Sequence, residues 1–216
     1  MIPIKFPHLL SVMQRKGHVI FSNDSKPCNL NIVAIRGLNP IADSYDDLLC
    51  VFWKYHGWNV RWFSVTTDPG CYYLQHPMTR RGTAIKAEGQ NLGVYKLDLH
   101  NGSYEALCQR LGPVWMYRDN DKNCVLATIE ETKEYGYAGL NYHARGGFQR
   151  RNPTPRSALS EVGRFFGIGK SSAGCCVFQY DQEFLEFREL CRTAARLWGN
   201  KFSDTLLHER DFGLSQ

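Results

Sequence analysis

The sequence has no long hydrophobic run, no Cys-x-x-Cys pair, no internal repeat and no low-complexity tail. Because no apolar window reaches the roughly 20 residues that a membrane-spanning helix needs, no span is expected. Without a Cys-x-x-Cys pair, neither a zinc ribbon nor a dithiol redox motif is supported. We therefore expect neither a metal nor a cofactor.

The N-terminal segment lacks the apolar core of a signal peptide, and Pro3 and Pro7 interrupt it. We therefore expect the protein to be made in the cytoplasm without a signal peptide. The chain has eight cysteines, of which only Cys175 and Cys176 are adjacent. An adjacent pair makes a poor disulfide, and the remaining cysteines are typical of buried thiols in a cytosolic product.

Positive charge is concentrated in one segment of the chain. An apolar content of 43% and a charged content of 22% are ordinary for a globular protein. The residues between His143 and Cys175 include six basic side chains and one acidic side chain, Glu161, so their net charge equals the formal +5 of the whole chain. A solvated basic loop and a rim that attracts an anionic substrate are both open interpretations. Nucleic-acid binding is a third interpretation and the least expected one, because no aromatic-interleaved basic stripe or known motif accompanies the segment.

Short strands dominate the predicted secondary structure. Aromatic and β-branched runs predict strands at 30–35, 58–67, 83–86, 93–99, 114–117, 125–129, 137–143 and 201–207. Apolar spacing predicts helices at 9–13, 45–55, 104–111 and 181–198, the last capped by Asp181 and ended by Gly199. We expect a mainly β, α+β chain with an N-terminal arm (1–28) and a single domain (29–216).

A candidate nucleophile lies in Ser172-Ala173-Gly174-Cys175, downstream of a predicted strand that carries His143. A thiolate is a strong nucleophile, and a neighbouring imidazole can accept the thiol proton. Gly174 lacks a Cβ, so its backbone can approach a substrate carbonyl closely. Asn141 shares a strand face with His143. The alternative is that Cys175 is one more buried cysteine.

His100 precedes the predicted turn at Asn101-Gly102. This position predicts an exposed residue at the end of a strand. A place at the edge of the candidate site is the alternative.

The cysteine and histidine segments resemble the catalytic segment of the L,D-transpeptidase family, cysteine enzymes that act on bacterial peptidoglycan. That family carries His-Gly on one strand and Ser-x-Gly-Cys at the start of the next. The matches are His143, followed here by Ala144-Arg145-Gly146, and Ser172-Ala173-Gly174-Cys175; Ile168-Gly169-Lys170 is also similar. The resemblance covers mainly residues 137–207. It implies a β-sandwich-like catalytic domain with an inserted basic loop at 144–167.

Two features depart from the family. Val177 stands where the family commonly has Arg, and His143 lies 32 positions before Cys175, which exceeds the usual spacing. A non-catalytic phage structural or cell-wall-binding protein that retains the fold is therefore the alternative hypothesis.

The resemblance implies roles for individual residues. Cys175 would attack the L-to-D bond of a peptidoglycan stem peptide, and His143 would activate the thiol and protonate the leaving amine. Backbone N–H groups of Gly174 and Cys175 would hold the oxyanion, Ser172 would brace the turn, and Asn141 would orient His143. The candidate substrate-binding residues are Arg145, Arg150, Arg151 and Lys170.

Hydrolysis is expected to dominate over cross-linking, because the segment that would cover the thiol is rich in Gly, Pro and Arg and would admit water. Three stretches (66–70, 82–85 and 141–143) are similar to phage-encoded proteins. A chain without an export signal fits a phage or prophage product that is carried in a virion or released at lysis. The sequence leaves the oligomeric state open.

Overall fold

The computed structural model describes residues 4–144 and 168–213 of the chain. The strands are β1 (Asn31–Arg36), β2 (Asp47–Lys54), β3 (Trp58–Thr66), β4 (Thr83–Lys86), β5 (Gly89–His100), β6 (Tyr104–Gln109), β7 (Val114–Asp119), β8 (Glu134–Gly136), β9 (Tyr142–Ala144), β10 (Cys176–Phe178) and β11 (Phe202–His208). The helices are α1 (Phe6–Arg15), α2 (Cys71–Gln75) and α4 (Asp181–Trp198), with 3-10 turns η1 (Glu130–Thr132) and η2 (Glu209–Phe212).

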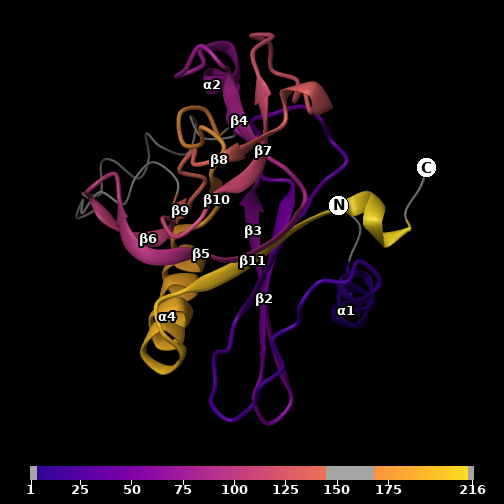
Figure 1. Cartoon of the computed structure of the whole chain (residues 1–216), viewed down its shortest axis with the longest axis vertical. Helices are drawn as coiled ribbons and strands as arrows, with labels where there is room; N and C mark the ends of the chain where they lie inside the picture. The colour runs from indigo at the N-terminus through magenta and orange to yellow at the C-terminus, as the bar shows by residue number, and fades with distance from the viewer. Residues whose placement is uncertain (1–3, 145–167, 214–216) are drawn as a thin grey trace, which may run out of the picture.

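Eight strands close into a barrel in the order β1-β11-β5-β6-β9-β10-β3-β2, and β4, β7 and β8 form a separate three-stranded sheet (Figure 1). β1 pairs in parallel with β11 on one side and antiparallel with β2 on the other, so the first and last strands of the chain are neighbours in the barrel. The predicted mainly β, α+β class is confirmed. The strands form a barrel, however, where the resemblance implied two stacked layers.

Two segments predicted as helices are strands. Residues 45–55 contain β2, which pairs with β1 and β3, and residues 104–111 contain β6, which pairs with β5 and β9. Most residues of β2 are buried. A strand buried on both faces carries a continuous apolar run, and such a run cannot be told from a buried helix by periodicity.

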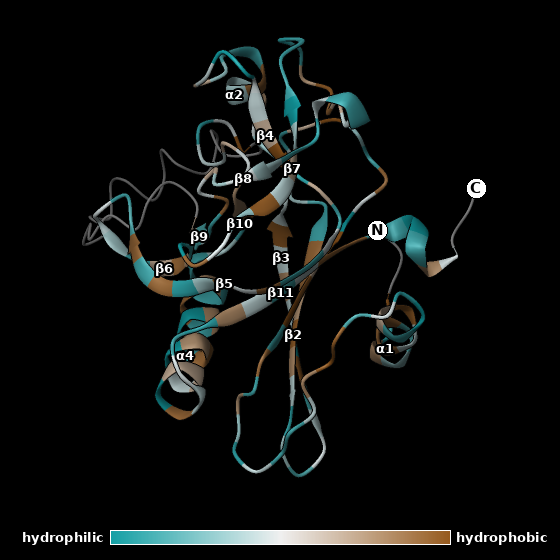
Figure 2. Ribbon diagram, viewed as in Figure 1, coloured by the Kyte–Doolittle hydropathy of each residue, from teal (hydrophilic) through white to brown (hydrophobic). Residues whose placement is uncertain are grey.

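The barrel core and α4 form one hydrophobic cluster. Figure 2 shows apolar residues along β3 and the central part of β2. Phe184 and Phe187 of α4 are buried against Phe178, with ring centroids 5.6 and 5.0 Å away. The predicted helix and its end at Gly199, which has φ of 92°, are confirmed. The predicted cap is wrong, because Asp181 is the first helical residue and Tyr180 precedes it without a side-chain cap.

The N-terminal arm is packed on the outer side of the barrel. Leu9, Val12 and Met13 of α1 are buried against a second apolar cluster that includes Val33 and Phe52. The arm also contacts the C-terminal turn, where Lys16 Nζ lies 2.7 Å from Asp211 Oδ1. The predicted helix at 9–13 is therefore confirmed and longer than expected.

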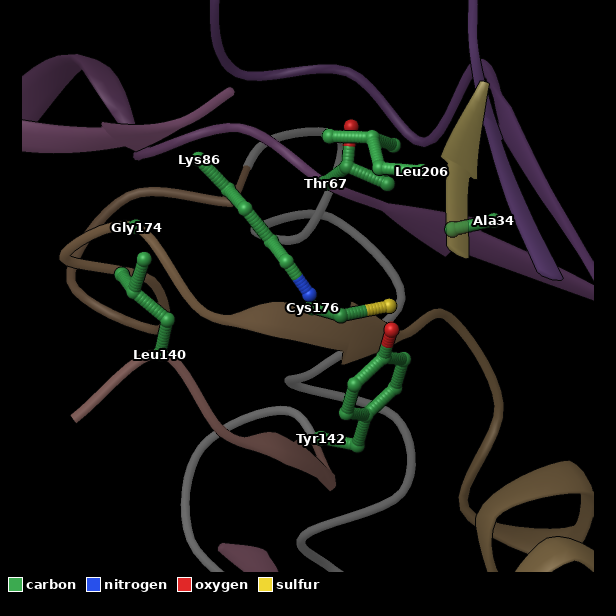
Figure 3. A pocket seen from close by; sticks show the side chains of 8 residues that line it. All are labelled: Ala34, Thr67, Lys86, Leu140, Tyr142, Gly174, Cys176 and Leu206. Atoms are coloured by element: carbon green, nitrogen blue, oxygen red, sulfur yellow. The ribbon is translucent and has the colours of Figure 1, made fainter. Parts of the chain in front are cut away.

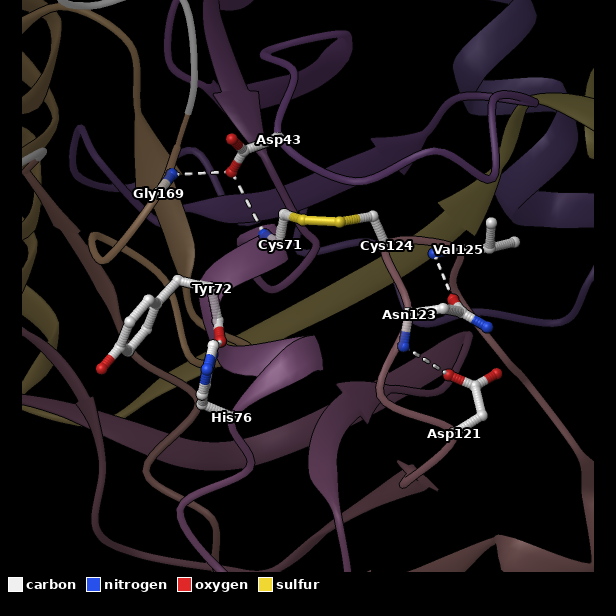
Figure 4. Close-up of a disulfide and its surroundings, with 9 residues drawn as sticks. All are labelled: Asp43, Cys71, Tyr72, His76, Asp121, Asn123, Cys124, Val125 and Gly169. Atoms are coloured by element: carbon white, nitrogen blue, oxygen red, sulfur yellow. Dashed lines mark hydrogen bonds between the residues drawn. A yellow bond between two sulfur atoms is a disulfide. The ribbon is translucent and has the colours of Figure 1, made fainter.

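Two other predictions are corrected. Residues 125–129 form no strand, since Val125 makes only an isolated bridge to Ile41. Cys71 and Cys124, which were expected to be free thiols, form a disulfide (Figure 4). They are 53 positions apart in the sequence and meet because the Cys71 N–H donates to Asp43 Oδ1 while Cys124 O accepts from Ala42 N.

No helix among residues 4–144 and 168–213 combines the length and the apolar character that a membrane span requires.

Candidate functional site

His143 lies on β9, and Cys175 directly precedes β10, which pairs with β9 in parallel. Val177 is aligned with His143, and the Cys176 N–H donates to Asn141 O over 2.9 Å. Side chains alternate between the faces of a strand, so His143 and its neighbour Tyr142 point in opposite directions. Cys175 lies two residues before the position opposite His143, so the barrel places the two candidates on neighbouring segments of the chain.

A network of hydrogen bonds fixes the turn before the cysteine. Ser172 Oγ donates to Cys175 O over 2.9 Å and accepts from Gly174 N over 3.1 Å. Gly174 has φ of 113°, and a Cβ at this position would overlap the carbonyl oxygen of Ala84. Ser172 therefore braces the turn. The Gly174 N–H, a candidate oxyanion donor, is engaged by Ser172 in this structure.

The imidazole of His143 is oriented by a backbone carbonyl. Its Nδ1 lies 2.7 Å from Ala144 O and 3.2 Å from the Tyr104 hydroxyl. A carbonyl oxygen can only accept, so Nδ1 carries the proton and Nε2 of the neutral ring holds the free lone pair. Burial, reinforced by nearby His100, lowers the pKa of His143 to about 4, while the Ala144 carbonyl opposes the shift. His143 is therefore neutral near pH 7.

His100 belongs to the same cluster, which corrects its prediction as an exposed residue. It is 8% exposed, and its ring stacks on His143 with centroids 4.2 Å apart. The reason is the β5–β6 hairpin, in which His100 pairs with Tyr104. Asn141, predicted to orient His143, instead places its Nδ2 3.0 Å from His100 Nδ1 and accepts from Gln109 N over 2.8 Å.

The Cys175 thiol is buried and protonated. It donates to Gly139 O over 3.3 Å. Burial raises the pKa of Cys175 to about 11, and a backbone hydrogen bond from Asn141 opposes this only in part. The lowered pKa that an activated, imidazole-paired thiol would have is therefore not found in this conformation. Among the hydrogen bonds of the described residues, none joins the Cys175 thiol to His143.

A second polar cluster, inside the barrel, was not anticipated from the sequence. Lys86 Nζ forms a buried ion pair with Asp204 and lies 2.8 Å from the Tyr95 hydroxyl, and the Tyr142 hydroxyl donates to Asp204 over 2.5 Å. Figure 3 shows Lys86, Cys176 and Tyr142 pointing into one cavity. The one available signal was a lysine at the end of the otherwise uncharged strand 83–86.

This cavity is small. It has a volume of about 10 Å³, close to the least that holds one water molecule. Its lining residues are Ala34, Thr67, Lys86, Leu140, Tyr142, Gly174, Cys176 and Leu206. The adjacent cysteines therefore occupy different surroundings, since Cys176 faces the Lys86 cluster and the Cys175 thiol turns to Gly139 O.

The predicted substrate-binding residues are only partly visible. Arg145, Arg150 and Arg151 lie outside the described residues, as does most of the predicted insertion 144–167. Lys170 is exposed, and its Nζ lies 4.1 Å from the centroid of the Tyr72 ring. A lysine over an aromatic face is held by a cation–π contact.

In the part of the chain that the structure describes, no three His, Cys, Asp or Glu side chains are grouped so as to hold a metal ion. Comparisons with models of protein families, with curated proteins and with solved structures found no match to the chain. The protein is thus a mainly β, α+β protein in which a closed barrel carries a buried cluster of cysteine, histidine and tyrosine.

Proposed function

We propose that the protein is a cysteine-dependent enzyme that hydrolyses the stem peptides of peptidoglycan, with Cys175 as the nucleophile and His143 as the general base. One observation carries this proposal. His143 Nδ1–H donates to Ala144 O, which leaves Nε2 as the base. His143 lies on β9, and β9 pairs with β10, the strand that begins directly after Cys175. Thiol catalysis requires this pairing of a nucleophile with an oriented imidazole.

The two pKa values define how the proton would move. With the pKa of Cys175 near 11 and that of His143 near 4, the resting pair is a thiol and a neutral imidazole. The thiol would turn from Gly139 O toward His143 when substrate binds. Nε2 would take the thiol proton as the sulfur–carbon bond forms, and general base catalysis in the attack avoids a standing thiolate.

The remaining steps conserve atoms and charge. The imidazolium of His143 would give its proton to the leaving amine as the carbon–nitrogen bond breaks, leaving a thioester on Cys175. Water, deprotonated by Nε2, would then attack the thioester carbonyl. The sulfur–carbon bond would break, the imidazolium would return its proton to the departing Cys175 thiolate, and the product would leave as a free carboxylic acid. Attack by a second amine would give cross-linking instead, and hydrolysis is the outcome we propose.

Two further observations support the choice of substrate and place of action. His143 and Ser172-Ala173-Gly174-Cys175 resemble the catalytic segment of L,D-transpeptidases, and this resemblance supports a peptidoglycan stem peptide as the substrate. The Cys71–Cys124 disulfide fits action outside the cytosol, because disulfides persist in oxidising surroundings. A phage or prophage product that is released at lysis, or carried in a virion, meets that requirement.

A non-catalytic cell-wall-binding or phage structural role is the second candidate. The thiol–Gly139 hydrogen bond and the raised pKa of Cys175 favour it, since both are properties of a buried structural cysteine. Under this hypothesis the cluster only stabilises the barrel.

Incubation of purified tetrapeptide-bearing muropeptides with the protein, followed by mass analysis, tests the proposal. Loss of the terminal residue, or opening of a cross-bridge with uptake of water, is expected for the wild type and for Cys176→Ala. Cys175→Ala should be inactive. Unchanged muropeptides with folded wild type would instead support the binding role.

A further inference from the structure

An exposed pair of aromatic side chains lies on the three-stranded sheet, away from the cysteine cluster. Trp115 of β7 is directly opposite Tyr135 of β8, and their ring centroids are 5.1 Å apart with planes tilted by 40°. The two residues are 50% and 57% exposed. Large aromatic side chains usually bury their faces, so an exposed pair in register is a potential contact surface.

A hollow with charged walls adjoins this pair. It has a volume of about 370 Å³ and is lined by Glu88, Trp115, Glu130 and Lys133. Lys133 Nζ lies 2.8 Å from Glu130 Oε1 and 6.0 Å from the centroid of the Trp115 ring. Tyr117 fixes the other carboxylate oxygen, because its hydroxyl donates to Glu130 Oε2 over 3.3 Å. The volume falls within the range of small-molecule sites.

We propose that this surface binds a saccharide whose sugar rings stack on Trp115 and Tyr135. The hydroxyl groups of the sugar would form hydrogen bonds with Glu88, Glu130 and Lys133. A pyranose is amphipathic, since its C–H face is apolar and its rim carries hydroxyl groups that both donate and accept. Aromatic faces beside carboxylate acceptors and an ammonium donor match both parts of such a ligand.

Other ligand classes fit this surface less well. The centres of protein–protein interfaces are depleted of Glu and Lys, whereas this hollow is lined by three such charged residues. A nucleic acid needs several basic side chains for its phosphates, whereas Lys133, the single cation among the described residues that line this hollow, is already paired with Glu130. A cationic ligand would compete with Lys133, which already pairs with Glu130 and lies over the rings of Trp115 and Tyr117.

The surface is connected to the candidate catalytic site through the backbone. The chain runs from Tyr135 to Gly139, whose carbonyl oxygen accepts from the Cys175 thiol. Gln109 holds this connection, because its Nε2 donates to Gly136 O over 3.0 Å and its Oε1 accepts from Leu140 N over 3.2 Å. A glycan bound at the sheet would therefore lie on the segment that leads to the thiol.

The choice of an N-acetylhexosamine oligomer as ligand rests on the proposed function, whereas the aromatic site itself does not depend on thiol chemistry. Titration of the full chain with a tetramer of β-1,4-linked N-acetylglucosamine, followed by tryptophan fluorescence and calorimetry, tests the inference. Saturable binding is expected for the wild type and equally for Cys175→Ala, which separates saccharide binding from catalysis.

Trp115→Ala and Tyr135→Ala should each weaken binding by about tenfold or more. The matched control is Tyr180→Ala, which removes a tyrosine of similar exposure (54%) from another part of the protein. Each variant is checked by its thermal unfolding. Absence of saturable binding by the wild type, or equal affinity of the Trp115 and Tyr135 variants and the wild type, would overturn the inference. Binding of a tetramethylammonium salt without binding of the saccharide would also overturn it.

Discussion

The rings of His100 and His143 stack with their centroids 4.2 Å apart and their planes 21° apart. Two imidazoles in this arrangement cannot both be charged at low cost, because their positive charges would repel each other in a buried site. Burial lowers the pKa of each ring, and the neighbouring His100 lowers the pKa of His143 further. The pair is therefore neutral in the folded protein near pH 7.

This relationship predicts a loss of stability in acid. The folded pKa of His143, about 4, lies below its ordinary value of 6.5, so the unfolded chain binds the proton more tightly. The free energy of unfolding therefore keeps its full value above pH 6.5. It falls by about 3 kcal/mol as the pH decreases from 6.5 to 4. The free energy of unfolding, measured with urea across this pH range, should depend less steeply on pH in His143→Gln than in the wild type. The exposed control His76→Gln should follow the wild type; equal slopes for both variants would contradict the account.

Reactivity of the thiol should rise only in alkali. Because burial raises the pKa of Cys175 to about 11, little thiolate exists near pH 7 in the folded protein. Iodoacetamide labelling with peptide mapping should find Cys175 slow at pH 7 and faster above pH 9. Rapid labelling of Cys175 at neutral pH would place its pKa well below this value.

The turn before the cysteine should not tolerate a larger residue. Gly174→Ala would require a strained φ of 113° and would bring Cβ against the Ala84 carbonyl oxygen. Gly139→Ala is the matched control, because Gly139 also has positive φ (66°) but has no atom within 4 Å of a built Cβ. We expect Gly174→Ala to cost about 2–3 kcal/mol of unfolding free energy and Gly139→Ala about 1 kcal/mol. Similar losses for the two variants would show that the contact with Ala84 is unimportant.

The buried pair of Lys86 and Asp204 should be strongly coupled. Lys86→Met would leave the Asp204 carboxylate buried without its cation, at a cost of about 3–5 kcal/mol. The double variant Lys86→Met/Asp204→Leu should be more stable than either single variant, because no unpaired charge remains. A double-mutant cycle on unfolding free energies measures this coupling. Additive losses would mean that the two charges do not interact.

Local patterns were sufficient for part of the fold. The three- and four-residue apolar spacing from Phe184 to Trp198 predicted α4, and Thr83–Lys86 was predicted with the bounds of β4. These elements were predictable because propensity and burial pattern agree along one continuous segment. The strands β2 and β6 were mistaken for helices, since burial on both faces removes the two-residue alternation that identifies a strand.

The contacts of the candidate site depend on pairings that no local pattern contains. His100 meets His143 only because β6 pairs with both β5 and β9. The Cys71–Cys124 disulfide joins segments 53 positions apart, and sequence spacing cannot specify such a pairing. The sequence therefore identified Cys175 and His143 as candidates but not their immediate partners.

The central claim, that Cys175 is the nucleophile of a hydrolytic enzyme, is tested most directly by trapping the acyl-enzyme. The protein is mixed with a tetrapeptide muropeptide in water enriched in heavy oxygen, quenched in acid at short times, and measured by intact mass and peptide mapping. The account predicts a transient acyl adduct on the peptide that contains Cys175, and one heavy oxygen in the new carboxylate of the product. No adduct and no labelled product from folded wild type, or the same product from Cys175→Ala, would contradict it.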